Sequence, residues 1–480
     1  MRHGLDPREN SKNPLTRFIS FIIATAVLAL FFFIPTPQGL TFAGKIVIGV
    51  FLWYLIVLIG GSLPLGIVGL IAPALLVILR IYPEKVAMGG FINDMSFLIL
   101  GALMFGAGMT VTNLGKRIAL MIISMMRSSK VTRINIGLLL ANLVLAPFFP
   151  ATIARGAFFY PIVNGINTLV KGDDKKASIL RASFLMWGVG FAPIFVATLF
   201  LTGAMPSLMV SAAYSARGVD VGWIEWFILT VPVLGLLPIL YFYFNRYYKL
   251  KDVEIVGSRE AIKTELASLG KISKEEVMLL IALASALFLW VFAPFGISSG
   301  MAAILVATGI FLPIGFKYGW KEINAKFLWG TWIFLAGSIS LAIVLCNSGA
   351  TNWLAKLIIS GLPLGLSPIL LMLVLFLGFQ VARAGISSAV AMAAIYIPLS
   401  ISMAPLLYLN SLPFTILTVT VLSYAFILPF SIETVLIAWS AGDISFTESL
   451  KVGTPLTIIS TIYCVLVLIP WFALMGAPLW

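Results

Sequence analysis

Apolar runs of 17 or more residues recur from Phe18 to Leu474 in this chain of 480 residues. A bilayer core of about 30 Å is spanned by roughly 20 apolar residues in a helix, so these runs have the length of membrane crossings. Only 10% of the residues are charged and the mean hydropathy is +1.08. The runs lack the period-two alternation of barrel strands. The sequence therefore predicts an all-α membrane protein with about eleven transmembrane helices and two re-entrant hairpins.

Lysine and arginine concentrate in alternate loops. Six segments hold 24 of the 31 lysines and arginines, which is the positive-inside pattern of cytoplasmic loops. These segments are 1–17, 115–133, 171–181, 245–276, 317–326 and 441–451. The pattern predicts a cytoplasmic N-terminus and an outside C-terminus. It also explains the net charge of +13 without nucleic acid as a partner. The polar N-terminal stretch has no small-residue cleavage site after its apolar run, so we expect a retained first helix and no signal peptide.

The residue types exclude several kinds of chemistry. The two cysteines, Cys346 and Cys464, lie in separate apolar segments, and the only histidine is His3. No Cys/His metal cluster or disulfide scaffold is therefore expected. The sequence has no GxxxxGK[ST] phosphate loop, and no catalytic triad is evident. We expect a protein that moves a solute, not an enzyme, and we expect it to need no cofactor.

Two stretches of the chain read as copies of one unit. LILGALMFGAGMTVTNLGKRIA resembles FLAGSISLAIVLCNSGATNWLA, with Gly101 matching Gly337 and Ala119 matching Ala355 at one offset of 236 residues. An odd number of crossings separates the copies, so the second should be inverted, as in many secondary transporters. We expect N-terminal scaffold helices in 1–94 and a cytoplasmic linker at 245–276. Repeat 1 should occupy 95–244, with a cytoplasm-entering hairpin at 132–170 and a broken helix at 177–216. Repeat 2 should occupy 277–480, with an outside-entering hairpin at 367–404 and a broken helix at 412–440.

Each expected hairpin contains one arginine in hydrophobic surroundings, Arg155 and Arg383, 228 residues apart. An arginine at a helix centre costs about 2.5 to 3.5 kcal/mol on insertion scales, so each needs partners or a water-filled cavity. In one interpretation each guanidinium lies at a re-entrant tip beside a helix N-terminus and binds a carboxylate. The two would then suit a substrate with two separated carboxylates. In the other, each arginine caps carbonyls or pairs with an acid to hold its hairpin together.

Other candidate residues lie at the same four interruptions. Glu433 is the only acid well inside an apolar segment, four residues after Pro429. It could carry a proton for coupling, or it could pair with Arg383 or Arg155. A single serine or threonine in a membrane helix often bonds its own backbone, but these residues cluster at the breaks. The further candidates for substrate binding are Thr152, Gly156, Thr202, Ser207, Gly385, Ser387, Ser388, Ser431 and Thr434.

Several phrases resemble the divalent anion:sodium symporter family. They are APFFPATIARGAFFYP, FLTGAMPS, SAVAMAAIYIP and FTESLKVG, and the resemblance extends over nearly the whole chain. Within the family it is strongest to the bacterial citrate/succinate and tartrate/succinate antiporters and the plastid 2-oxoglutarate/malate translocators. The resemblance implies a homodimer. It also implies an elevator mechanism, in which the two hairpins and two broken helices slide against a scaffold.

The chain departs from the family pattern at the tips. The family's Ser-Asn-Thr signature falls on Ala151-Thr152-Ile153 and on about Ser388-Ala389-Val390, and a proline-rich break falls on residues 432–435. Most side chains that sodium-coupled members use are therefore missing. We expect exchange, or proton coupling through Glu433. Backbone carbonyls near Thr152, Gly203 and Ser388 could still hold sodium.

Together these observations predict a secondary active transporter of small organic anions, most of all di- and tricarboxylates, by exchange or ion-coupled elevator transport. The expected partners are the small anionic substrate, the lipid bilayer and a second copy of the chain. One alternative is a transporter on the same scaffold for a sulfonate or inorganic oxyanion. A channel for anions or a membrane scaffold protein is the other. The exact substrate, the coupling and the direction of transport stay open.

Overall fold

The computed structural model describes residues 14–172, 174–312, 316–363, 365–386, 388–441 and 444–480. In these ranges every regular element is a helix, and the one extended pairing is an isolated bridge between Lys130 and Glu254. Ten helices of the described part are long and apolar enough to cross a membrane, two of them arms of the expected hairpins. The prediction of an all-α membrane protein is confirmed.

The first half of the chain contains fourteen α-helices joined by short 3-10 and π-helical segments. They are α1 (Pro14–Phe33), α2 (Phe42–Gly60), α3 (Leu65–Ile78), α4 (Glu84–Ala87), η1 (Gly89–Phe91), α5 (Asp94–Thr112), α6 (Leu114–Met125), α7 (Val131–Leu145), η2 (Ala146–Phe148), α8 (Thr152–Asn167), α9 (Lys175–Leu185), the π-helical η3 (Met186–Phe191), α10 (Ala192–Phe195), η4 (Ala197–Leu199), η5 (Leu201–Gly203), α11 (Met205–Ser215), α12 (Trp223–Thr230), η6 (Val231–Gly235), α13 (Leu236–Tyr247) and α14 (Ser258–Ser268).

The second half begins at α15, where Ser273 and Glu276 form a reciprocal capping box that fixes the helix start. Its elements are α15 (Lys274–Phe292), η7 (Pro294–Gly296), α16 (Ser299–Gly309), α17 (Trp320–Lys326), α18 (Trp329–Asn347), α19 (Ala350–Ser360), α20 (Pro368–Arg383), α21 (Ala389–Leu406), α22 (Ser411–Ser423), α23 (Glu433–Ala441), α24 (Phe446–Tyr463), the π-helical η8 (Cys464–Leu468) and α25 (Ile469–Leu474).

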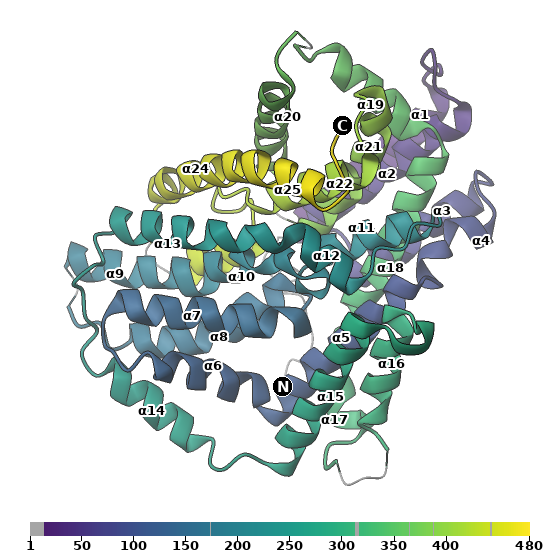
Figure 1. Ribbon diagram of the computed structural model, residues 1–480. Coiled ribbons are helices and arrows are strands. Elements are labelled where there is room, and N and C mark those ends of the chain that lie inside the picture. The colour runs from purple at the N-terminus through teal and green to yellow at the C-terminus, as the bar shows by residue number, and fades with distance from the viewer. Residues whose placement is uncertain (1–13, 173, 313–315, 364, 387, 442–443) are drawn as a thin grey trace.

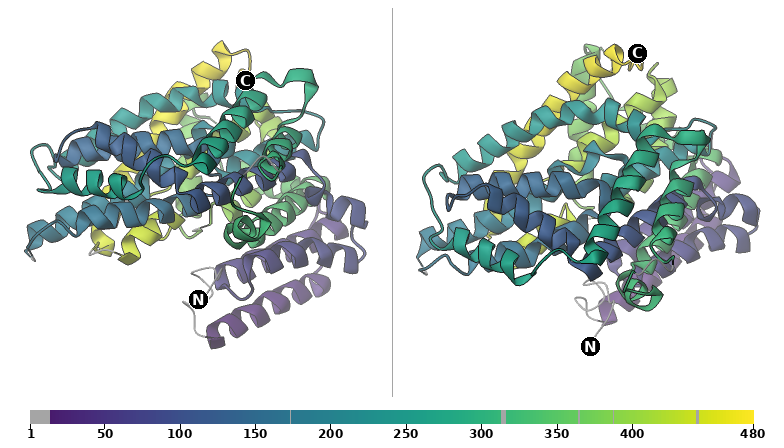
Figure 2. Two further views of the ribbon diagram at one scale, coloured as in Figure 1. Left: turned by 90° about the horizontal axis from the view of Figure 1, so that it is seen from below. Right: turned by 60° about the horizontal axis from the view of Figure 1, so that its bottom comes forward.

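Helices from the two halves of the chain pack on one another. Figure 1 shows α7, α8, α9 and α13 running alongside one another on the left, with α5, α15 and α16 at the lower right. In the left view of Figure 2, helices α1 to α3 form a layer at the lower edge of the molecule. Within that layer α1 packs on α2, while α3 packs on α18 from the other half of the chain. Helix α21 of the second candidate hairpin packs in turn on α18 and α19.

Glycines allow the supporting helices to approach one another closely. A Cβ on Gly101 of α5 would lie 2.6 Å from the Cβ of Ala303 in α16, and a Cβ on Gly337 of α18 would lie 1.8 Å from the carbonyl oxygen of Gly69 in α3. Small residues serve this purpose in membrane helices, where backbones can then pack in direct contact. The two glycines that match in sequence therefore play the same packing role, each against a helix from the opposite half. The internal repeat itself stays a prediction.

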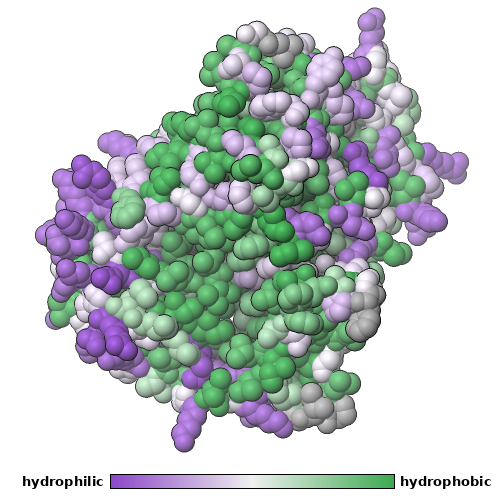
Figure 3. All heavy atoms as spheres, viewed as in Figure 1, coloured by the Kyte–Doolittle hydropathy of each residue, from purple (hydrophilic) through white to green (hydrophobic). Residues whose placement is uncertain are grey.

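The surface agrees with a position in a bilayer. Figure 3 shows a broad apolar area across the middle of the molecule, with hydrophilic residues gathered at its left and lower edges. Ile281 of α15 and Leu305 of α16 are 61% and 60% exposed. Side chains of this kind are stable on an outer face when acyl chains surround it. The exposed lysines Lys171, Lys175 and Lys176 precede or begin α9, where an apolar crossing would leave the bilayer.

We predict that Gly337→Ala destabilises the protein by about 1 to 3 kcal/mol, because the added methyl group overpacks the contact with Gly69. Thermal unfolding in detergent measures the effect. Gly165→Ala in α8 is the matched control, since a Cβ there meets open space. Equal melting temperatures for the two variants would contradict the role of Gly337.

Candidate functional site

The first hairpin consists of α7 and α8, joined by a turn at residues 146–151. The broken helix beside it runs from α9 to α11 and changes to π-helix before Pro193. Proline lacks the N–H of a regular helical bond, and a π-helical turn is a common adjustment in membrane helices and often marks a functional site. Several backbone carbonyls near this break therefore need donors from elsewhere.

Arg155 supplies those donors. It is the fourth residue of α8 and 0% exposed. Its Nη1 donates to the carbonyl oxygens of Ala146 (3.4 Å), Phe149 (3.2 Å) and Gly203 (3.3 Å), and its Nη2 donates to that of Pro193. The first two acceptors belong to the hairpin turn, and the last two belong to the broken helix. The guanidinium thus ties the hairpin turn to the break, which is the second of the two interpretations made from the sequence.

Arg383 makes a similar link in the second hairpin, which consists of α20 and α21. It is the last residue of α20 and 1% exposed, and its Nη1 donates to the carbonyl oxygen of Ser431 at 3.0 Å. The Ser431 hydroxyl donates back to the carbonyl oxygen of Ala384 at 2.8 Å. Glu433 and Tyr396 lie close enough to act electrostatically on Arg383. In the part of the chain that the structure describes, Arg383 has fewer backbone acceptors than Arg155, and a carboxylate lies nearby.

Arg155 and Arg383 do not occupy equivalent places in their hairpins. Arg155 follows its turn, whereas Arg383 precedes its turn. Their acceptors are equivalent, because Gly203 lies two residues before the start of α11 and Ser431 lies two residues before the start of α23. The same connection between hairpin and break is therefore made from opposite sides of the two tips.

Residues 431–434 touch both hairpins. Ser431 bonds the second hairpin as described, and Thr434 faces the first, where a Cβ on Gly156 would lie 2.9 Å from the Thr434 methyl group. The Thr434 hydroxyl also donates to the carbonyl oxygen of Gly190 at 2.7 Å. Glu433 stands between these contacts, half-buried, as the first residue of α23, where the helix dipole favours a carboxylate. The stretch is the point at which the two hairpins and the two breaks come together.

The remaining predicted residues lie at the same tips and breaks. Thr202 is buried and accepts a hydrogen bond from Trp223 Nε1 at 3.1 Å. Ser388 caps α21 by accepting from the Ala391 amide at 3.3 Å. Ser207 is the third residue of α11 and 0% exposed, and its hydroxyl has no hydrogen-bond partner among the described residues. Of the predicted neutral ligands with described side chains, Ser207 is thus the one with a buried and unused polar group.

Three more predicted positions are Thr152, Gly385 and Ser387. Thr152 begins α8 and is 9% exposed. Within the described residues no side chain caps the first turn of α8, so its amides are available to an anion. A Cβ on Gly385 would meet open space, so the second tip is not tightly packed there. Ser387 lies outside the described residues.

Two residues at the breaks were missed from the sequence. Gln380 is 1% exposed, lies one turn before Arg383, and donates from Nε2 to the carbonyl oxygen of Val421 at 2.7 Å. Tyr424 follows α22, and its hydroxyl group donates to the carbonyl oxygen of Phe195 at 3.1 Å, so it joins the two breaks. An amide one turn before an arginine in an apolar helix was an available signal for Gln380. For Tyr424 the sequence held none, because the partner is 229 residues away.

The site contains cationic, hydroxyl and backbone groups and one carboxylate. No group of three or more His, Cys, Asp or Glu side chains that could hold a metal ion occurs in the part of the chain that the structure describes. Interrupted hairpins and helices that meet inside an apolar helical bundle are the organisation of a secondary transporter. The fold and the site thus define the class, a helical membrane transporter.

Comparison with known proteins gives the family. The chain belongs to the family described as "Sodium:sulfate symporter transmembrane region", whose model matches residues 15–477. The chain is similar to the L-tartrate/succinate antiporter of Escherichia coli (strain K12), with 29% identity over 416 residues, 82% of this chain and 84% of the relative. The L-tartrate/succinate antiporter of Shigella sonnei (strain Ss046) matches with the same identity and coverage. The resemblance noted in the sequence is confirmed, and these names indicate a transporter, not an enzyme.

We predict that Arg155→Ala destabilises the protein much more than Arg383→Ala does. Among the described residues the first change leaves four buried carbonyl groups without their donor, at about 1 to 3 kcal/mol for each unsatisfied group, whereas the second leaves one. Unfolding followed by tryptophan fluorescence in detergent, with and without succinate, measures both effects. A stable Arg155→Ala protein that no longer responds to succinate would instead make Arg155 a direct ligand.

Proposed function

We propose that this protein is a secondary transporter that exchanges small dicarboxylates, such as succinate and tartrate, across a cell membrane. Relatives named as L-tartrate/succinate antiporters cover most of the chain, which supports this substrate class. The site supports it chemically. Arg383, the uncapped start of α8 and the unused hydroxyl of Ser207 are all donors for carboxylate oxygens.

The observation that carries the proposal of exchange is the placement of the Arg155 guanidinium. Carbonyl oxygens from a turn and a helix break are ligands of the type that hard cations take in proteins. In this chain four such oxygens accept from Arg155. A fixed cation at this place leaves those oxygens satisfied without sodium. We therefore propose that this half of the site needs no coupling sodium ion, although the family's description includes sodium.

Charge complementarity supports a dicarboxylate substrate. Arg155 and Arg383 together carry two positive charges, which match the two negative charges of succinate or tartrate. The Glu433 carboxylate lies within electrostatic reach of Arg383. We propose that Glu433 pairs with Arg383 in the empty site and that a substrate carboxylate displaces it.

We further propose that the hairpins α7–α8 and α20–α21 move together with the broken helices as one unit. The links from Arg155 to Gly203 and from Arg383 to Ser431 support this, since each fixes a hairpin to its broken helix. The close-packed helices α3, α5, α16 and α18 would form the stationary scaffold. The family resemblance supports a homodimer, and the distribution of lysine and arginine among the loops supports a cytoplasmic N-terminus and an outside C-terminus. Cross-linking in native membranes tests the dimer.

A second candidate substrate is an inorganic oxyanion, favoured by the family's description as sodium:sulfate symporters. The first tip is also not lined by polar groups alone, because the rings of Phe149 and Phe158 pack there with their centroids 5.6 Å apart. Competition of sulfate with labelled succinate in the assay below separates the two substrates. Full inhibition by sulfate at a lower concentration than unlabelled succinate would favour the oxyanion.

We expect labelled succinate to enter proteoliposomes only when these contain an internal dicarboxylate. Replacing external sodium with potassium should leave the rate unchanged, because Arg155 already satisfies the carbonyl oxygens. Liposomes without protein are the control. Uptake into substrate-free vesicles that is driven by an inward sodium gradient would contradict exchange.

We predict that Glu433→Gln tightens succinate binding several-fold at neutral pH, because it removes the competing carboxylate beside Arg383. Isothermal titration of the detergent-solubilised protein measures the Kd. Glu225→Gln, in the first turn of α12, is the control and should leave the Kd unchanged. Weaker binding in Glu433→Gln would instead indicate that the protonated acid contacts the substrate.

A further inference from the structure

The polar segment between the two halves of the chain is anchored at both ends. At one end, its residues Val253 and Ile255 pair with the entrance of the first hairpin: the Val131 amide donates to the Val253 carbonyl and the Ile255 amide donates to the Ser129 carbonyl, both at 2.9 Å. Ile255 is 2% exposed. This end of the segment is therefore packed on the hairpin and is not a free loop.

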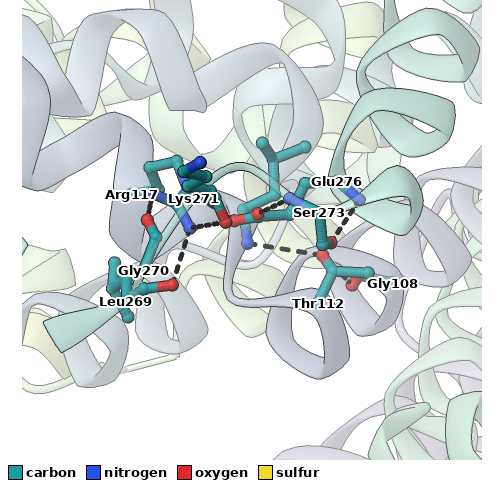
Figure 4. Close-up of polar contacts among 9 residues, drawn as sticks. Gly108, Thr112, Arg117, Leu269, Gly270, Lys271, Ser273 and Glu276 are labelled. Atoms are coloured by element: carbon teal, nitrogen blue, oxygen red, sulfur yellow. Dashed lines mark hydrogen bonds and ion pairs between the residues drawn. The ribbon is translucent and has the colours of Figure 1, made fainter. Parts of the chain in front are cut away.

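At the other end, Arg117 of α6 holds the segment. Arg117 is 8% exposed, and its Nε donates to Glu276 Oε1 at 2.7 Å. Its Nη atoms donate to the carbonyl oxygens of Gly270 (2.9 Å), Leu269 (3.0 Å) and Lys271 (3.3 Å). Figure 4 shows this guanidinium directed at the turn that ends α14 and at the capping box that begins α15. We call this set of contacts the Arg117 anchor.

Helix α14 lies between the two anchored ends. It packs along α6, where Lys116 Nζ and Glu265 Oε1 are 2.5 Å apart. Glycines in the left-handed region stand on either side of it, Gly257 (φ 82°) and Gly270 (φ 66°), and a Cβ on either would meet open space. Such glycines allow the chain direction to change without displacing neighbours. Helix α14 is thus flanked at both ends by glycines at which the direction of the chain can change.

Helix α19 follows α18 as α6 follows α5, and we call α6 and α19 the arm helices. Helix α19 is held in the same manner as α6, at the equivalent position. Trp353 lies 236 residues after Arg117, the same offset that relates Gly101 to Gly337. Its Nε1 donates to the carbonyl oxygen of Gln38, in the loop that precedes α2, at 3.2 Å. Arg117 likewise holds the loop that precedes α15. Two unrelated side chains therefore make one type of contact, which argues that anchoring the arm is the shared requirement.

We infer that the Arg117 anchor fixes arm helix α6 to α15, which packs on the proposed scaffold helices α5 and α16. We infer further that α14 pivots from this anchor while its other end follows the entrance of the moving hairpin. The inference rests on the proposed transport function and on the movement of the hairpins as a unit. Arg117 is a positioning residue in this scheme, because it lies away from the tips and breaks. Its loss should slow the movement without changing the site.

The test is exchange of labelled succinate by proteoliposomes containing Arg117→Gln, with the Kd for succinate measured separately in detergent. We expect the maximal rate to fall about ten-fold, because the variant loses several charge-assisted hydrogen bonds that hold α6 in place. The Kd should stay within about two-fold of the wild-type value. Arg117→Lys should recover part of the rate, and Trp353→Phe should show a smaller loss of rate. Lys116→Gln, which removes only the exposed ion pair, is the matched control.

A cross-link tests the fixed end independently of folding defects. In a background of Cys346→Ala and Cys464→Ala, a reducible link between Lys116→Cys and Glu265→Cys should leave exchange intact, since α14 stays beside α6. The inference is overturned if this link blocks exchange reversibly, if Arg117→Gln keeps the full rate, or if its rate and affinity fall in parallel. A wild-type protein that exchanges no dicarboxylate would instead overturn the proposed function.

Discussion

The bonds from Arg155 to the backbone are the interaction on which the candidate site depends. A helix interrupted inside a membrane leaves carbonyl groups that lipid cannot satisfy. Arginine suits this task, because its planar guanidinium carries five donors and stays charged. It closes the hairpin turn onto Pro193 and Gly203 at once. The interruption in this half of the candidate site is therefore stabilised by a residue that also contributes positive charge to the site.

A second group of residues near Arg155 also connects several elements. Residues Ser431 to Thr434 join both hairpins, and the half-buried Glu433 between them is within electrostatic reach of Arg383. Close glycine contacts add to these polar links, both at Gly337 in α18 and at Gly203 beside the first break.

Much of the fold could be predicted from the sequence, since hydropathy fixes where a chain can cross a bilayer. The arginines were found because a charge in an apolar segment always needs an explanation. Their partners were not found, because backbone carbonyls carry no signal in the amino-acid sequence. Tyr424, which reaches across to Phe195, and the anchor that Arg117 makes were missed for the same reason.

The sequence by itself determined that this is a helical membrane protein of an anion transporter family, with its unusual charges at the tips of two hairpins. Periodicity, charge asymmetry and local motifs are patterns along the chain, so they can be recognised in the sequence alone. Only the tertiary structure decided what the arginines do there. Arg155 and Arg383 each bond a carbonyl 48 residues further along the chain. Contacts between such distant segments arise only when the helices pack, and they link each hairpin to its broken helix.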